Sequence, residues 1–161
     1  MSSVGSLVAR RKDMTNAEPS RLLHHELTDR VLGVFFDVYN ELGYGFSEFV
    51  CSSVFAIALA DAGLDVIQEA RLPVTFRGRI VATFRADIVV NGLVIVEVKA
   101  RPEIERRDQA QVLNYLKASG FAVGLVVNFG PRPTFKRVVY ETARFAHLVP
   151  TATAEESDKE L

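Results

Sequence analysis

The sequence predicts an α/β (α+β) domain with the element order ααβββαββ. Three observations lead to this fold class. Up to Gly63, apolar residues recur at spacings of three and four, which is typical of amphipathic helices. After Gly63 the chain changes to short β-rich runs separated by turn residues. One further helical stretch then divides these runs from two later strands, so helices and strands share one domain.

Two helices are expected first. The periodic pattern begins at Leu23 and ends at Gly43, a residue that favours helix termination. A second helix should run from about Ser47 to Ala62, with Gly63 as its stop. The first helix presents Leu23, Leu27, Val31, Val34, Phe35, Val38 and Leu42 on one face, and the second is expected to bury Val50, Val54, Ala58 and Leu59.

A three-stranded meander should follow. Arg77-Gly78-Arg79 and Asn91-Gly92 both favour tight turns between strands. The β-rich runs cover residues 66–67, 72–76, 80–90 and 94–100.

A third helix and two more strands complete the predicted domain. Pro102 cannot continue a strand ladder, and a helix is expected from about Glu105 to Ala118, closed by Gly120. Ala122–Val127 is apolar throughout, as a buried interior strand would be. Thr134–Tyr140 is predicted as the final strand.

Length and composition are those of one globular domain: 161 residues, 48% of them hydrophobic. A chain of this length buries roughly two thirds of its unfolded surface, so it needs no disulfide or metal to fold. The single cysteine, Cys51, excludes an intramolecular disulfide and suits a reducing compartment. The longest apolar run is far shorter than the roughly 20 residues that span a bilayer, so we expect a cytoplasmic protein. The folded unit is expected at 21–148, between a mobile tail, 1–20, and an acidic tail, 149–161.

The net charge of −1 conceals an uneven distribution. Residues 71–140 carry 12 basic and 5 acidic side chains, whereas the segments before and after have an excess of acid. A basic half is compatible with a polyanionic partner, and equally with a mixed solvated surface.

Several common sites are excluded. Gly43-Tyr44-Gly45 begins like a dinucleotide-binding loop, but Glu48 stands where the third glycine should be. Cys51 and the three histidines lack the spacing of zinc ligands. No serine lies in a GxSxG elbow.

Asp87, Glu97 and Lys99 are the charged residues of interest in the expected strands. Because side chains alternate across a strand, Glu97 and Lys99 lie on one face. A two-residue turn between the strands would place Asp87 opposite Val96. A three-residue loop, residues 91–93, places it opposite Glu97 instead. We expect a three-residue or bulged loop, because only that register brings the two carboxylates together.

This trio suits metal chemistry. Two neighbouring carboxylates repel unless a divalent cation lies between them, and such oxygen ligands suit Mg²⁺ or Mn²⁺. A metal there polarises a phosphodiester and generates hydroxide. Lys99 would orient the attacking water or stabilise the developing negative charge. The same alternation of Glu and Lys also occurs on ordinary exposed strands. The trio alone therefore does not identify a metal site, and motifs elsewhere in the chain are needed to support it.

Two motifs outside the strands add to the trio. Gln111 and Tyr115 are four residues apart and share one face of the third expected helix, beside Asn114. Glu48 lies in the first turn of the second helix, shortly after Gly45.

Together these residues resemble the GxxExxY family, a branch of the PD-(D/E)xK nuclease superfamily. The resemblance extends from about Leu27 to Tyr140. The motifs that carry it are Glu41-Leu42-Gly43, Gly45-x-x-Glu48, Leu72-Pro73-Val74 with Phe76 and Gly78, Arg85-Ala86-Asp87, Val94–Lys99, Gln111–Lys117 and Val127–Gly130.

The resemblance implies a restriction-endonuclease-like core, with a mixed central sheet of about five strands flanked by helices. It also implies a Mg²⁺-dependent nuclease acting on DNA, with RNA as the alternative substrate. Asp87, Glu97 and the carbonyl of Val98 would hold the metal. Glu48 would contact it directly or through water, and Lys99 would be the catalytic lysine.

Further roles follow from the resemblance. Gln111 and Tyr115 would position Lys99 or the scissile phosphate. Single-domain relatives often act as dimers, so a homodimer is also considered. The candidates for contacts to nucleic-acid phosphates are Arg77, Arg79, Arg85, Arg101, Arg106, Arg107 and Lys117.

One departure from the family pattern leaves alternatives open. Cys51 replaces the tyrosine of GxxExxY, at a position that either contacts the active site or only packs. Apart from a nuclease, the same residues are compatible with a catalytically weak or inactive module that binds nucleic acid or protein. A structural homo-oligomer with a vestigial acidic pocket is a third alternative.

Overall fold

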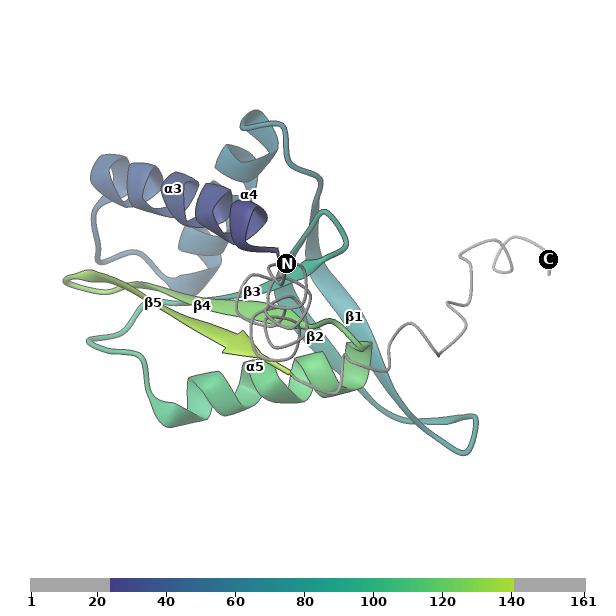
Figure 1. Ribbon diagram of the computed structural model, residues 1–161. Coiled ribbons are helices and arrows are strands. Elements are labelled where there is room, and N and C mark those ends of the chain that lie inside the picture. The colour runs from purple at the N-terminus through teal and green to yellow at the C-terminus, as the bar shows by residue number, and fades with distance from the viewer. Residues whose placement is uncertain (1–23, 141–161) are drawn as a thin grey trace, which may run out of the picture.

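A computed structural model describes residues 24–140, and the expected tails at 1–20 and 149–161 lie outside this range. The predicted order ααβββαββ is confirmed (Figure 1). No helix among the described residues is long and apolar enough to cross a membrane. The elements are α3 (His25–Leu42), α4 (Glu48–Asp61), β1 (Val66–Phe76), β2 (Arg79–Val90), β3 (Val94–Lys99), α5 (Arg106–Ser119), β4 (Val123–Phe129) and β5 (Pro133–Val139).

The strands form one mixed five-stranded sheet in the order β1-β2-β3-β4-β5. Only β3 and β4 pair in parallel, and the other neighbours are antiparallel. A parallel pair needs a crossover connection, which α5 supplies between β3 and β4. In Figure 1, α3 and α4 cover one face of the sheet and α5 covers the other. Segments β3 and β4 are buried along their whole length because both faces are covered.

The predicted helix boundaries agree with the structure to within about two residues. Gly43 follows α3 with a positive φ of 73°, which a glycine adopts without strain. Ser47 caps α4 by accepting a hydrogen bond from the Val50 N–H at 3.3 Å. Gly120 closes α5 in the left-handed conformation.

The predicted buried face of α4 is partly wrong. Leu59 is buried as expected, but Val50, Val54 and Ala58 are only half-buried. The helix is apolar on nearly every side, so periodicity did not determine which side faces the sheet. The fully covered positions are Cys51, Phe55, Ala56 and Leu59.

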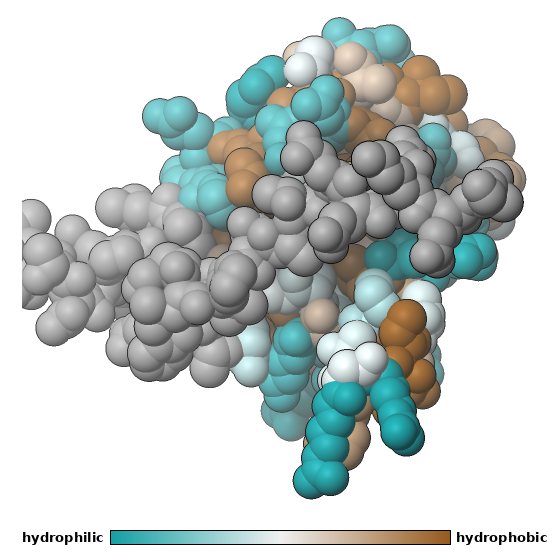
Figure 2. All heavy atoms as spheres, turned by 90° about the vertical axis from the view of Figure 1, so that its right-hand side faces the viewer, coloured by the Kyte–Doolittle hydropathy of each residue, from teal (hydrophilic) through white to brown (hydrophobic). Residues whose placement is uncertain are grey.

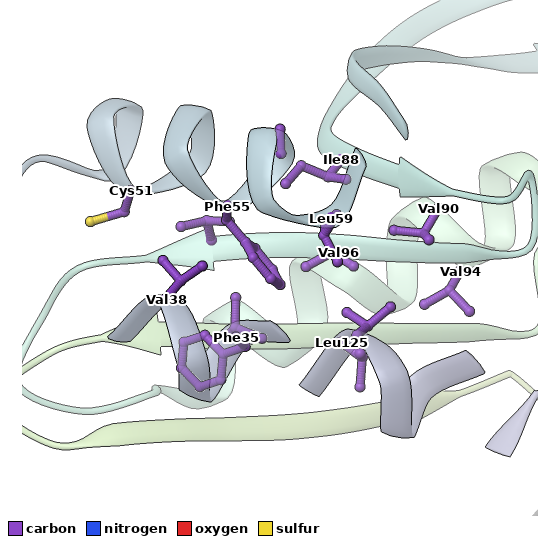
Figure 3. Packing of buried hydrophobic residues seen from close by; sticks show 14 of the residues in the cluster. Phe35, Val38, Cys51, Phe55, Leu59, Ile88, Val90, Val94, Val96 and Leu125 are labelled. Carbon is purple, nitrogen blue, oxygen red and sulfur yellow. The ribbon is translucent and has the colours of Figure 1, made fainter. Parts of the chain in front are cut away.

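The larger core lies between the sheet and the two N-terminal helices. Phe35 of α3 packs edge-on against Phe129 of β4, with ring centroids 5.0 Å apart, and against Phe55 of α4 at 6.0 Å. Figure 3 shows Phe35, Phe55 and Leu59 pointing between the helices and the strands. Edge-to-face pairs of this kind stabilise a core beyond the area that they bury.

On the other face, Gly124 of β4 allows α5 to approach the sheet. A Cβ atom at this position would collide with the Val112 side chain of α5. By contrast, Gly33 on the exposed side of α3 has no neighbour that a Cβ would meet.

We therefore expect Gly124→Ala to lower the free energy of unfolding by about 1–3 kcal/mol, because overpacking forces α5 away from the sheet. Gly33→Ala is the control and should raise it by about 0.5–1 kcal/mol, since alanine favours a helix interior. Urea denaturation of both variants measures these changes. Equal effects of the two substitutions would contradict the close packing of α5.

Candidate active site

The β2–β3 hairpin has the register that the candidate site requires. Val90 pairs with Val94 and Ile88 with Val96, so three residues, 91–93, form the loop. The Leu93 N–H donates to the Val90 carbonyl at 3.0 Å, which closes the turn. The predicted three-residue loop is therefore confirmed. The pairing ends at Ile88 and Val96, and the same register continued by one residue would place Asp87 opposite Glu97.

Immediately beyond Ile88, β2 stops pairing with β3 although β3 continues. Beyond this point two carboxylates, in place of the β2 backbone, accept hydrogen bonds from β3 and the residue after it. Asp87 Oδ2 accepts a hydrogen bond from the Val98 N–H at 2.8 Å, and Glu48 Oε1 accepts one from the Ala100 N–H at 3.4 Å. Because an N–H left unpaired in a protein interior is costly, these bonds fix both carboxylates against the edge of β3.

The neighbouring strand is irregular at the same level. The register of β1 and β2 would place Glu69 opposite Asp87, but this pair is missing from the ladder, which has a second irregularity between Val74 and Thr75. The φ of Glu69, 50°, is unusual for a residue other than glycine inside a strand. The ladder therefore loosens on both sides of Asp87, which frees its carboxylate from regular sheet geometry.

Glu97 is a buried carboxylate with an unsatisfied oxygen. The residue is 4% exposed, and its Oε2 has no hydrogen-bond partner among the described residues. Burial, and after it the charge of Asp87, raise the pKa of Glu97 to about 8. Burial also raises the pKa of Asp87. For both carboxylates, the effect of burial on the pKa exceeds that of the nearby Lys99 and of their hydrogen bonds, so the negative charge is only partly compensated.

Lys99 lies between two acidic side chains. Its Nζ is 3.6 Å from Glu97 Oε1 and 4.0 Å from Asp108 Oδ1. The lysine is 7% exposed and Asp108 2% exposed, so the group is shielded from water. Asp108 thereby fixes the position of the ammonium group from the α5 side.

The sequence analysis did not identify Asp108. Two signals point to it in retrospect: it follows Glu105 at the spacing of a capping box, and it shares a helix face with the buried Val112 and Tyr115. The Glu105 N–H donates to Asp108 Oδ2 at 2.8 Å, so the capping box orients this carboxylate.

The helix pair Gln111 and Tyr115 lies on the same side of the sheet. Gln111 Nε2 donates to the Tyr115 hydroxyl at 2.8 Å. Burial, with the charges of Glu97 and Asp87 as further causes, raises the pKa of Tyr115 to about 12. These charges act on the phenol because it is close to both carboxylates. A hollow of about 350 Å³ adjoins it, lined by Phe84, Arg107, Ala110, Gln111, Asn114 and Tyr115.

Arg101 is placed differently from the other basic candidates. Its Nη1 lies 3.1 Å from Asp108 Oδ1, and Glu105 and Glu48 lie within 4.0 Å of the same guanidinium. Asn128 fixes its backbone, accepting from the Arg101 N–H at 3.1 Å and donating to its carbonyl at 2.9 Å. Arg101 thus holds the acidic residues around Lys99 together.

The remaining basic candidates do not form one surface. Arg85 lies on β2 two residues from Asp87, Arg77 lies in the turn after β1, and Arg79 begins β2. Arg106 and Arg107 begin α5, where the Arg107 Nε contacts Glu105 Oε2 at 2.7 Å. Lys117, near the other end of α5, lies over the Tyr140 ring.

The donor atoms fit a cation that keeps part of its water shell. Among residues 24–140, no three acidic, histidine or cysteine side chains converge to enclose a metal. The available set is instead Asp87, Glu97 and the Val98 carbonyl, which lies on the same edge as the Val98 N–H. Mg²⁺ is typically bound in this way, by one or two carboxylates and several waters. The unpaired Glu97 Oε2 is the observation that favours a missing partner.

Access to this edge is open from the α4 side. A hollow of about 350 Å³ is lined by Glu48, Phe49, Ser52, Ser53, Gln68, Glu69 and Asp87. Cys51 is not among these residues, because it is buried in the core beside Val38 and Phe55 (Figure 3). Burial raises the pKa of its thiol. Cys51 therefore packs in the core of the domain.

Comparisons with known proteins agree with this fold. The sequence profile of the PD-(D/E)XK nuclease superfamily matches residues 25–138. No curated protein matches the chain. Similar solved structures include an alkaline exonuclease from Laribacter hongkongensis, at 13% identity and a TM-score of 0.42. That match covers 58% of this chain and 56% of the exonuclease, so the chain spans little more than half of that protein. The protein SSO0001 matches at 16% identity and a TM-score of 0.38, over 73% of this chain and 70% of the other.

Glu97 should make the stability of the metal-free protein depend on pH. The folded state keeps the Glu97 proton up to a pKa of about 8, whereas the unfolded chain releases it near 4.5. The folded state therefore binds more protons between these values, and the free energy of unfolding falls as pH rises through this window, by about 1.4 kcal/mol for each unit of pKa difference.

Glu97→Gln should remove this part of the pH dependence and stabilise the protein near pH 8. Urea denaturation at several pH values with EDTA present measures it, with the exposed Glu103→Gln as the control. An unchanged slope in Glu97→Gln would show that Glu97 is ionised in the folded state.

Proposed function

Because the chain belongs to the PD-(D/E)XK nuclease superfamily, we propose that it is a metal-dependent nuclease that hydrolyses phosphodiester bonds, in DNA rather than RNA. The observation that carries this proposal is the group formed by Asp87, Glu97 and Lys99, in which a buried carboxylate oxygen of Glu97 has no hydrogen-bond partner within residues 24–140. Most buried side-chain oxygens in proteins have such a partner, so this one supports a bound cation.

Asp87, Glu97 and the Val98 carbonyl would hold the cation, with Glu48 contacting it directly or through water. Bound Mg²⁺ or Mn²⁺ supplies Lewis-acid polarisation of the phosphodiester and lowers the pKa of a coordinated water. The hydrogen bond from the Val98 N–H keeps Asp87 in place before any metal arrives. This preorganisation reduces the reorganisation that binding would otherwise need.

Lys99 would orient the attacking water or stabilise negative charge on the phosphate. Asp108 and Glu97 lie within ion-pair distance of its ammonium group and so hold its charge near the candidate metal ligands. Gln111 and Tyr115 bond to each other and leave Lys99 to these carboxylates. We therefore assign the Gln111–Tyr115 pair to positioning the scissile phosphate.

We also propose that the chain belongs to the GxxExxY branch of this superfamily. Gly45 and Glu48 retain the spacing of that motif, and Glu48 contacts the backbone beside the candidate lysine. The buried position of Cys51 supports a substitution that does not change the active centre. The basic composition of residues 71–140 supports a polyanionic substrate.

Asp87→Ala should abolish Mg²⁺- or Mn²⁺-dependent cleavage, and Lys99→Ala should reduce it by at least about 100-fold, because each removes a group that acts on the reacting phosphate. A cleavage screen over single-stranded, double-stranded and branched DNA, with RNA alongside, measures this. Glu103→Ala, which removes an exposed carboxylate, is the control.

The screen also separates the proposal from a binding module that lacks turnover. A module would show salt-dependent affinity for nucleic acid and no cleavage by the wild-type chain. Undiminished cleavage by Asp87→Ala would refute the assignment of the site.

A further inference from the structure

The ends of β1 and β2 project from the domain as a hairpin arm, defined here as residues 71–85. Figure 1 shows this hairpin extending beyond the sheet and α5 at the lower right. Its base is anchored on α5, where Leu72 is buried and the Phe84 ring lies 5.5 Å from the Tyr115 ring. From Thr75 to Thr83, the part called the outer arm, every residue is exposed. The outer arm thus contributes little to the core.

The charge of the arm has one sign. It contains four arginines and no acidic residue, and none of the four pairs with a carboxylate among the described residues. Arg71 and Arg85 stand directly opposite each other in the strand register. Like charges at such a pair destabilise a hairpin. Their placement therefore favours an external anion that neutralises both.

The tip of the arm combines this charge with exposed apolar side chains. Phe76, Ile80 and Val81 are 62%, 68% and 63% exposed, and the Arg77 guanidinium lies 5.0 Å from the centre of the Phe76 ring. In Figure 2, where this end of the molecule faces the viewer, hydrophilic side chains lie beside hydrophobic ones at its lower end. Exposed apolar side chains gathered at one place, with polar groups around them, are typical of a contact surface.

We propose that the arm binds in a groove of double-stranded DNA next to the active centre, an inference that rests on the proposed nuclease function. A two-stranded β-ribbon fits the major groove, where arginines reach phosphates and base edges and apolar side chains contact thymine methyl groups. A single strand is bound instead mainly by aromatic side chains that stack on bases, and the outer arm carries one aromatic residue, Phe76.

The arm has the reach for this role. It continues β2 directly from Asp87, and Arg79 lies eight residues from Asp87. At about 3.4 Å per strand residue the tip is about 27 Å from the active centre. Duplex DNA advances about 3.4 Å per base pair, so the arm would follow about eight base pairs on one side of the cleavage point.

The test is a binding measurement with EDTA present, so that no cleavage occurs. The full chain is titrated with a duplex of about 24 base pairs, about two helical turns, and with one of its strands. Arg77→Glu combined with Arg79→Glu should weaken duplex binding at least about 10-fold and reduce the slope of log affinity against log salt by about 2. The control is Arg132→Glu combined with Lys136→Glu, in β5 and the turn before it. It changes the net charge by the same amount as the arm variant and should weaken duplex binding much less.

A second pair of variants tests the apolar part of the tip. Ile80→Ser should weaken duplex binding more than binding to the single strand. Ile57→Ser removes an isoleucine of similar exposure, 62%, from α4 and should change neither. Thermal denaturation shows whether each variant is folded. We expect all of them to fold, because the substituted side chains are exposed.

Three outcomes would overturn the inference. The first is an equal loss of DNA affinity in the arm variants and the control variants, and the second is an equal loss of affinity for the duplex and for the single strand. The third is an arm variant that converts a dimer to a monomer, which would make the arm a contact between copies of the chain. Arm-dependent duplex binding without cleavage of any substrate would instead refute the proposed nuclease and leave the arm as a duplex-binding element.

Discussion

The active centre depends on the point at which β2 leaves β3. Regular pairing would satisfy the Val98 N–H with another strand, but the Asp87 carboxylate accepts this bond instead. Since an unmade buried hydrogen bond costs about 1–3 kcal/mol, the split ladder holds the carboxylate firmly. The same break leaves room for Glu48 at the Ala100 N–H, and it leaves the buried Val98 carbonyl on an edge that no longer pairs with β2. One interruption of the sheet thus gathers most of the candidate ligands.

The charged residues at this edge are expensive to bury. Glu97, Lys99 and Asp108 are all nearly inaccessible to water, and Glu97 retains an unsatisfied oxygen. Such groups contribute to stability only when each has its full set of partners. Asp108 of helix α5 partly compensates the charge of Lys99, and Arg101 forms ion pairs with both Asp108 and Glu48. The remaining deficit lies at Glu97, where a cation would relieve both the desolvation and the repulsion from Asp87.

Sequence patterns predicted the elements because helix caps, turn residues and alternation are local. The three-residue loop was predicted because only it brings Asp87 to Glu97, since the turn residues alone also allow two residues; the face shared by Glu97 and Lys99 was predicted from strand geometry. The burial of α4 did not follow, since an almost uniformly apolar helix has no preferred side. Asp108 was missed, and Asn128 was noted only as part of a motif, because their roles depend on contacts between distant segments. The burial of Cys51 is likewise visible only in the packed core.

The arm and the candidate active centre share strand β2, so a few residues of one strand connect the proposed DNA-binding surface to Asp87. The central claim is that this edge of β3 holds a divalent cation. An anomalous difference map from crystals soaked in Mn²⁺ tests it most directly, because it locates the ion independently of any substrate. The account predicts a peak in contact with Asp87, Glu97 and the Val98 carbonyl, lost in crystals of Asp87→Ala. A fully occupied site elsewhere, or no peak at this edge, would contradict it.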